Sequence, residues 1–335
     1  MGKVVAAVGM SHAPGALAFP ETCPENIRTK LEDASLELGK SLAAGEPDVI
    51  FAFLDDHYEN FFIGKNMPSI AIGVADSHVG PADQWMETLR IKEKTIFPGA
   101  PKIAEHVLSS LVENGFDVSR AGSTEYGNNL LMPWVLMKPG IKCPIIPVYI
   151  NVFTPPLIPY KRAYALGEAI ANAVETLPDS TKVAYLCTGG LSHWPPYWNE
   201  FQASPDDKFM QRMKRYQTEG KEYLKTDPRL FIEFDDYEVE MAKKNEYPLN
   251  NHHPLVNEKW DRMFMDKFCA GDSSYMKGLT YREVEDEAGH GGHEVLNWVA
   301  MLGAMKGQKS RLLVYEPVIE WICGMTYVDF DVTKR

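Results

Sequence analysis

The sequence has few cysteines and no long apolar run, and both absences limit what the protein can be. Its 335 residues include five scattered cysteines with no Cys-x-x-Cys pair. This pattern argues against a disulfide scaffold or a zinc knuckle and is typical of a reducing compartment. No run of 18 apolar residues occurs, and no basic segment followed by a signal-length apolar run opens the chain. We therefore expect a cytoplasmic protein without a membrane span or a signal peptide.

Positive charge is also scarce. The chain carries 34 Lys and Arg against 46 Asp and Glu, a formal net charge of −12, and its basic residues form no stripe. Because binding to phosphates needs concentrated positive charge, we expect no nucleic-acid partner. The chain also lacks a Gly-x-Ser-x-Gly elbow, a P-loop and a Gly-x-Gly-x-x-Gly motif. Cys187 lies inside a predicted strand, where we expect a core residue and not a nucleophile.

Apolar runs alternate with segments of helical periodicity over the first 200 residues. The predicted strands lie within KVVAAVGMSHAP (3–14), DVIFAFLDDHYENFF (48–62), CPIIPVYINVF (143–153) and KVAYLCTGGLSHWP (182–195). The predicted helices cover 25–45, 99–115 and 160–178. Such alternation predicts an α/β fold with a mostly parallel twisted sheet flanked by helices.

The pattern changes after residue 199. Residues 199–250 are rich in Lys, Glu, Asp, Tyr and Met and show helical periodicity, whereas closing strands return at 310–330. No Gly/Ser/Pro-rich linker divides the chain. We therefore predict a single catalytic domain, residues 1–335, that carries a helical insertion at 199–250.

Three histidines follow predicted strands directly. His12, His57 and His193 each come just after an apolar run. In parallel α/β sheets, ligands bind at the carboxyl ends of the strands, so these side chains are expected to share a site. Two imidazoles and one carboxylate form the facial triad typical of non-haem Fe(II) oxygenases.

The spacing alone does not identify the carboxylate. Asp55, Asp56 and Glu59 lie beside His57, and Glu294 opens an apolar helix after a glycine-rich turn. Glu294 could point back to the sheet edge, or it could serve only as a favourable charge at a helix N-terminus. The pattern leaves these alternatives open.

Two further pairs of histidines lie in polar turns. His290 and His293 belong to GHGGHE, which could supply metal ligands but is not the His-Glu-x-x-His pattern. A glycine-rich turn with exposed histidines is the favoured interpretation. His252 and His253 are expected in a polar loop.

Several segments, in the same order along most of the chain, resemble the class III extradiol dioxygenases, the family of the protocatechuate 4,5-dioxygenase β subunit. They are GMSHAPG, DVIFAFLDDHYENFF with PSIAIG, IIPVYINVFTPP with KRAYALGEAIANAVE, TGGLSHWP, GHGGHEVLNWVAMLGAM and YEPVIEWICGM. The resemblance implies Fe(II) as the cofactor, with His12, His57 and Glu294 as its ligands. It also implies that His193 is an acid/base and not a ligand.

The chain departs from the family pattern at three places. Tyr126 stands where many members have a second active-site histidine, and some aminophenol-cleaving relatives have a tyrosine there. We predict that Tyr126 hydrogen-bonds a substrate oxygen or superoxide. Ile319 aligns with a serine of carboxylate-binding members, so recognition of a carboxylate by that route is in doubt. The interval between His193 and Glu294 is longer, by roughly residues 199–250.

The resemblance implies cleavage of a catechol-type ring by O2, the substrate being mononuclear or a lignin-derived biaryl. Two alternatives remain open: an ortho-aminophenol dioxygenase, and a hydrolase or metal-binding protein without oxygenase activity on the same fold. No segment resembles a separate α subunit, and we expect a homodimer. The amphipathic 199–250 segment is predicted to cap the pocket in cis, with a dimer contact as the alternative.

Overall fold

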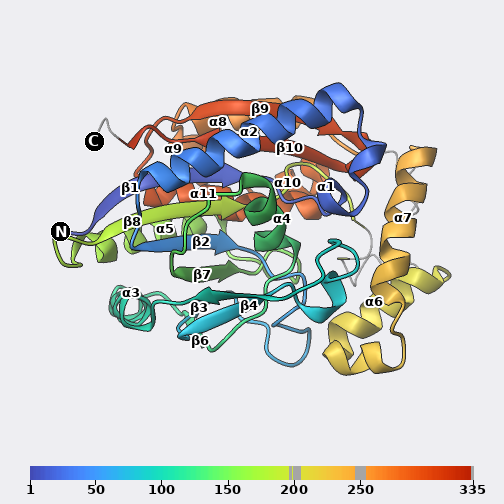
Figure 1. Ribbon diagram of the computed structural model, residues 1–335, viewed down its shortest axis with the longest axis horizontal. Coiled ribbons are helices and arrows are strands. Elements are labelled where there is room, and N and C mark those ends of the chain that lie inside the picture. The colour runs from blue at the N-terminus through green and yellow to red at the C-terminus, as the bar shows by residue number, and fades with distance from the viewer. Residues whose placement is uncertain (196–197, 199–204, 246–253, 333–335) are drawn as a thin grey trace.

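An eight-stranded sheet forms the centre of the protein (Figure 1). The computed structural model describes residues 1–195, 198, 205–245 and 254–332. Across the sheet the strands are β6 (Ser119–Ala121), β3 (Ile70–Gly73), β7 (Ile145–Ile150), β2 (Val49–Leu54), β8 (Lys182–Thr188), β1 (Lys3–Met10), β10 (Cys323–Asp329) and β9 (Arg311–Val318). Strands β7, β2, β8 and β1 are mutually parallel, whereas β10 is antiparallel to both β1 and β9. The predicted α/β fold with a mostly parallel sheet is confirmed.

The central strands are continuously apolar because helices cover both faces of the sheet. Every residue of β2 and β7 is buried. Helix α2 (Glu25–Ala44) packs on β1, β9 and β10, with α4 (Asn128–Met137) beside it, and α2 crosses in front of the sheet in Figure 1. Helices α5 (Tyr160–Glu175) and α11 (Val295–Ala304) lie on the opposite face. A strand covered on both sides has no polar face, which explains the uninterrupted runs.

Helices α5 and α11 approach each other unusually closely. A side chain on Gly167 would overlap the carbonyl of Ala300, and one on Gly303 would overlap the carbonyl of Tyr164. The two glycines thus let the helix backbones touch at two points. Helix α11 also packs on β8 and β2, and it begins directly after Glu294.

The other elements surround this core. They are α1 (Gly15–Ala18), the hairpin β4 (Ser77–Gly80) and β5 (Thr95–Pro98), α3 (Pro101–Glu113), α8 (Glu258–Cys269), α9 (Ser273–Gly278) and α10 (Tyr281–Ala288). Short 3-10 turns include η5 (Gly291–Glu294) and η6 (Ile319–Trp321). Helix α8 packs on β9 and β10, and α3 packs on α5.

The described part of the 199–250 segment contains two α-helices, at one end of the sheet (Figure 1). Helix α6 spans Lys208–Glu219 and α7 spans Leu230–Lys244. Phe231 and Phe234 of α7 pack on Trp85, with ring centroids 5.1 and 5.8 Å apart. The predicted ends of the insertion and the histidine pair at 252–253 lie outside the described residues, and the single-domain division stays a prediction.

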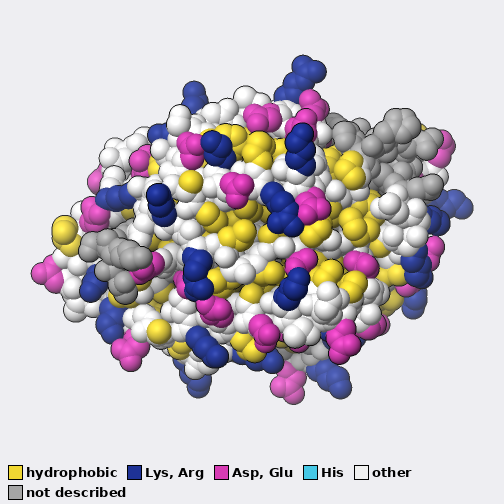
Figure 2. Space-filling model, turned by 90° about the horizontal axis from the view of Figure 1, so that it is seen from above, with side chains coloured by type: hydrophobic (Ala, Val, Ile, Leu, Met, Phe, Trp, Pro, Cys, Tyr) yellow, Lys and Arg dark blue, Asp and Glu magenta, His cyan; other side chains and the backbone are white. Residues whose placement is uncertain are grey.

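One face of the protein carries side chains of both charges. On the face seen in Figure 2, Lys and Arg side chains are interspersed with Asp and Glu. Among the residues that the structure describes, no helix is long and apolar enough to span a membrane.

Candidate metal centre

Three adjacent parallel strands bring the predicted histidines to one edge of the sheet. Strand β1 ends at Met10, just before His12, and β2 ends at Leu54, just before Asp55 and His57. Strand β8 lies between them and leads through Gly189 and Gly190 to His193. Because parallel strands end at the same edge, the three histidines converge although they are far apart in the chain.

Glu294 reaches this edge from the other end of the chain. It ends the turn η5 at the start of α11, and its carboxylate accepts a hydrogen bond from the backbone N–H of Gly190. Its Oε2 lies 3.2 Å from His12 Nε2, and its Oε1 lies 3.6 Å from His57 Nε2. The His12 and His57 rings meet edge to face, with centroids 5.2 Å apart. All three side chains are buried.

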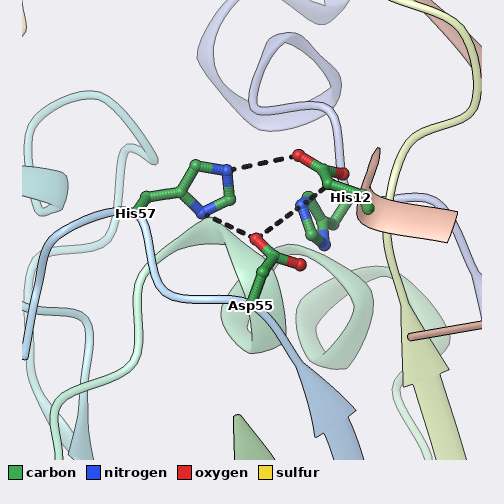
Figure 3. Close-up of side chains that lie close together, drawn as sticks. His12, Asp55 and His57 are labelled. Carbon is green, nitrogen blue, oxygen red and sulfur yellow. Dashed lines mark ion pairs between the residues drawn. The ribbon is translucent and has the colours of Figure 1, made fainter. Parts of the chain in front are cut away.

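Asp55 completes a group of four donors (Figure 3). Its Oδ2 lies 3.3 Å from His57 Nδ1 and 3.7 Å from His12 Nε2. Donor atoms of His12, Asp55, His57 and Glu294 all lie within 4.8 Å of one another. Asn297 Nδ2 donates to the other oxygen of Asp55, which fixes the orientation of its carboxylate.

The polar atoms of this group fit a cation. Both ring nitrogens of His12, Nδ1 of His57 and Oδ2 of Asp55 are buried without a hydrogen-bond partner among the described residues. Burying such atoms unpaired is costly unless a ligand satisfies them. Imidazole and carboxylate together suit divalent transition metals such as iron. The donor set therefore fits the facial triad predicted from the sequence, with Asp55 as a fourth donor nearby.

The electrostatics of the cluster also favour positive charge. Burial by itself would lower the pKa of His12, but the Glu294 and Asp55 carboxylates raise it above its ordinary value. Burial would raise the pKa of Glu294, yet His12 and His193 beside it hold that pKa well below the usual range. Burial raises the pKa of Asp55. The buried carboxylates of Glu294 and Asp55 thus lie beside imidazoles that offset their negative charge. A metal ion bound between them could offset this charge instead.

The other two carboxylates considered from the sequence face elsewhere. Asp56 accepts hydrogen bonds from the backbone N–H groups of Asn60 and Phe61. Glu59 accepts from the backbone of His57 at 2.7 Å and from Trp85 Nε1 at 2.6 Å. Both carboxylates thus support the loop that carries His57.

His193 lies beside the group in a fixed orientation. Its Nδ1 donates to the carbonyl of Leu191 at 2.8 Å, and its Nε2 lies 3.4 Å from Glu294 Oε1. A side chain on Gly291 would overlap the imidazole ring. Asp261 accepts from the backbone N–H of Ser192 at 2.8 Å and so anchors the residue before it. The ring is held by backbone on both sides, with Nε2 directed at the donor cluster.

A cavity opens on these residues. Besides the histidines and Glu294, its lining includes Trp85, Asn128, Trp198, Phe234, Glu238 and Trp321. Asn128 is a residue that the sequence reasoning missed. Its Nδ2 donates to the carbonyl of His12 at 3.0 Å, and its Oδ1 is buried without a partner among the described residues. Its one sequence signal is its position two residues after Tyr126.

The remaining two predicted site residues, Tyr126 and Ile319, are not part of the described lining of the cavity. Tyr126 is fully buried between the rings of His78 and Phe97, at centroid distances of 5.6 and 5.4 Å. Its hydroxyl has no hydrogen-bond partner among the described residues. Ile319 is partly buried in η6, whose Trp321 lines the cavity. Their predicted roles stay predictions.

His290 and His293 are buried, not exposed as the sequence reasoning favoured. His290 Nδ1 and His293 Nε2 lie 3.0 and 2.9 Å from the same oxygen of Glu285. His290 Nε2 donates to the carbonyl of Phe153 at 2.7 Å, and His293 Nδ1 lies 2.8 Å from the hydroxyl of Tyr160. These donors could also hold a metal. Since every nitrogen already has a protein partner, we interpret the group as an anchor for the turn that carries Glu294.

Replacing Glu285 by Gln should weaken this anchor. Burial raises the pKa of Glu285, but hydrogen bonds from His290 and His293 outweigh it and hold the pKa far below the ordinary value. Because the pKa of Glu285 is lower in the folded protein than in the unfolded chain, where it is about 4.3, the ionised carboxylate stabilises the fold above pH 4.3. This stabilisation is lost as the pH falls further. We expect Glu285→Gln to lower the free energy of unfolding by about 1–3 kcal/mol at pH 7.

The measurement is urea unfolding at pH 7 and at pH 3.5. The difference between wild type and Glu285→Gln should shrink at the lower pH. The exposed Glu287 of the same helix supplies the control variant Glu287→Gln. An equal difference at both pH values would contradict the ionic origin of the effect.

Comparisons with known proteins identify the family of this chain. A family model described as the catalytic LigB subunit of aromatic ring-opening dioxygenase matches residues 6–326. The chain is 30% identical over 319 residues to a 2,3-dihydroxyphenylpropionate/2,3-dihydroxicinnamic acid 1,2-dioxygenase of Pseudomonas putida, covering 94% of this chain and 95% of that protein. It is 27% identical over 327 residues to a protein of the same description from Photorhabdus laumondii, covering 95% and 94%. The chain therefore belongs to the family of catalytic LigB subunits of aromatic ring-opening dioxygenases and is an extradiol ring-cleavage enzyme.

Proposed function

We propose that the protein uses Fe(II) to cleave a catechol-type ring, with His12, His57 and Glu294 as the iron ligands. The convergence of these three buried side chains at the cavity supports the proposal most strongly. Bound Fe(II) would supply adjacent open positions through which electrons pass from the diol to O2. Asp55 faces Nδ1 of His57, and we propose that it orients this ring from outside, as carboxylates commonly do for metal-bound histidines.

We assign proton transfer to His193. His193 lines the cavity, and its Nδ1 is occupied by the Leu191 carbonyl. Nε2, which lies 3.4 Å from Glu294 Oε1, can accept a proton from a substrate hydroxyl and later return one to the ring-opened product. An imidazole suits both steps because its ordinary pKa lies near neutrality.

The substrate class follows from the family. The relatives are named for 2,3-dihydroxyphenylpropionate and 2,3-dihydroxicinnamic acid, both of which carry neighbouring ring hydroxyls. For this chain we propose a catechol, either mononuclear or a lignin-derived biaryl. We further propose a cytoplasmic homodimer without a separate α subunit, which light scattering of the purified protein would test.

The direct test is anaerobic reconstitution with Fe(II), followed by O2 uptake with a panel of catechols and ortho-aminophenols. We expect uptake of one O2 per ring cleaved, with catechols preferred. Restoration of activity by Mn(II) or Zn(II) alone, or uptake only with aminophenols, would contradict the proposal.

We also propose that the 199–250 segment caps the cavity. Phe234 and Glu238 of α7 belong to its lining, and Phe231 and Phe234 pack on Trp85. Replacing residues 203–247 by a short Gly/Ser linker should admit water and loosen the coupling of O2 uptake to product. Since that deletion could disturb folding, Phe234→Ala provides a milder variant, with KM expected to rise about 10-fold.

The measurement compares O2 consumed with product formed. The exposed residue Asp236 of the same helix provides the control variant Asp236→Asn. A folded deletion variant with unchanged KM and tight coupling would favour a dimer contact instead of a cap.

A further inference from the structure

Asn128 carries a buried hydrogen-bond acceptor in the lining of the cavity. It begins α4 and is 1% exposed. Its Nδ2 donates to the carbonyl of His12 at 3.0 Å, which fixes the orientation of the amide. Its Oδ1 is buried without a hydrogen-bond partner in the part of the chain that the structure describes. Because an unpaired buried acceptor is costly, a ligand in the cavity is expected to supply the donor.

The next residue is an asparagine whose role is fully accounted for by the protein. Asn129 Nδ2 donates to the carbonyl of Asp55 at 2.6 Å. Its Oδ1 accepts from the backbone N–H groups of Gly127 and Leu130 at 3.1 and 2.8 Å. Asn129 is also absent from the described lining of the cavity. Both asparagines thus tie a loop at the sheet edge to α4, and this support accounts for Nδ2 of Asn128 but not for its Oδ1.

The acceptor belongs to a residue that contacts a proposed metal ligand directly. Asn128 bonds the backbone of His12, and the two residues line the same cavity. A catechol that gives one proton to His193 keeps one O–H group. An amide oxygen can accept a hydrogen bond from this hydroxyl without adding a charge to the site. The second hydroxyl of the substrate therefore matches the acceptor in chemistry and in place.

We propose that Asn128 is a substrate-binding residue, whose Oδ1 accepts a hydrogen bond from the catechol hydroxyl that stays protonated. The inference rests on the proposed function, because it concerns the same site and assigns the first proton to His193. The two hydroxyls of the substrate are thus divided between two side chains. His193 takes the proton of one, and Asn128 holds the other in place.

The test compares two ligands that offer neighbouring oxygens but differ in their protons. Catechol keeps a hydroxyl after losing one proton, whereas ionised 2-hydroxypyridine N-oxide has none. Both are titrated against the full-length enzyme, loaded with Fe(II) and kept free of O2, and binding is followed by the quenching of tryptophan fluorescence. Asn128→Leu keeps a similar volume but has no acceptor. We expect it to weaken catechol binding by about 3–10-fold relative to the N-oxide, the effect of one hydrogen bond between neutral partners.

Two further variants separate substrate binding from support of the loop. Asn128→Asp keeps an oxygen acceptor but loses the N–H that holds the His12 carbonyl, and it should preserve the ratio of the two affinities. Asn128→Ala removes the same atoms as Asn128→Leu with less bulk, and it gives the same comparison if the leucine variant does not fold. The exposed Asn114 at the end of α3 supplies the control variant Asn114→Leu, which should change neither affinity.

The outcomes separate this inference from the proposed function. Equal weakening of both ligands in folded Asn128→Leu or Asn128→Ala would make Asn128 a support of the His12 loop alone and overturn the inference. A ratio lowered as far in Asn128→Asp as in Asn128→Leu would also overturn it, because the acceptor is then not what matters. No binding of either ligand to the wild type, together with no O2 uptake with any catechol, would instead refute the proposed function.

Discussion

Glu294→Gln is expected to abolish metal binding and ring cleavage while leaving the protein folded. Glutamine keeps the shape but loses the charge that faces His12 and His57 at 3.2 and 3.6 Å. Since changes to residues outside the ligand set already cost 10–100-fold in metal affinity, loss of a ligand should cost more than about 100-fold. His12→Ala and His57→Ala should behave alike. The loss of metal is measured as metal content after anaerobic Fe(II) loading and dialysis. Retention of the fold is measured by circular dichroism.

Asp56→Asn is the matched control for this change. Asp56 adjoins His57 in sequence, but its carboxylate accepts hydrogen bonds from Asn60 and Phe61 and does not face the other donors. Since Asp56 supports the loop that carries His57 but is not a proposed ligand, this variant should lose far less metal affinity than Glu294→Gln. If Glu294→Gln retained full iron, the essential carboxylate would be another one, and Asp55 is then the candidate that the geometry offers.

His193→Ala should slow turnover by on the order of 10²–10⁴-fold, the usual cost of removing a general acid/base. Because the ring lies beside Glu294 and is held by the Leu191 carbonyl, we expect iron content and anaerobic substrate affinity to stay near wild type. Single-turnover kinetics and metal analysis of the same preparation separate chemistry from binding.

A parallel loss of iron in His193→Ala would make His193 a ligand. The control is His106→Ala, since His106 lies on α3 and bonds Thr176, away from the cavity. It should change neither iron content nor turnover.

The centre of the fold could be predicted from the sequence, whereas its edges could not. Strands β1, β2, β7 and β8 are buried on both faces and leave unmistakable apolar runs. Strand β6 has only three residues, and β4 and β5 form a separate hairpin, so none of them carries such a run. Helix α4 escaped prediction because it is apolar almost all round and contains Pro133.

The site residues also divide into those that the sequence could predict and those that it could not. The rule that parallel strands end at one edge was sufficient to group His12, His57 and His193. It could not choose Glu294, which arrives through η5 at the start of α11 and is adjacent only in three dimensions. Asn128 and Glu238 reach the cavity from helices, where periodicity predicts a buried side but not what that side faces.

The ligands proposed for the metal lie near opposite ends of the chain, His12 after the first strand and Glu294 before the last helix. A cation held between them would close most of the polypeptide into a single loop. The binding free energy of the metal would then oppose any opening of either terminal segment. It would add about 2.7 kcal/mol to the free energy of opening when the free metal concentration exceeds the dissociation constant 100-fold. Amide hydrogens in β1 and α11 would exchange with solvent in one cooperative event in the loaded protein, and in separate local openings without metal.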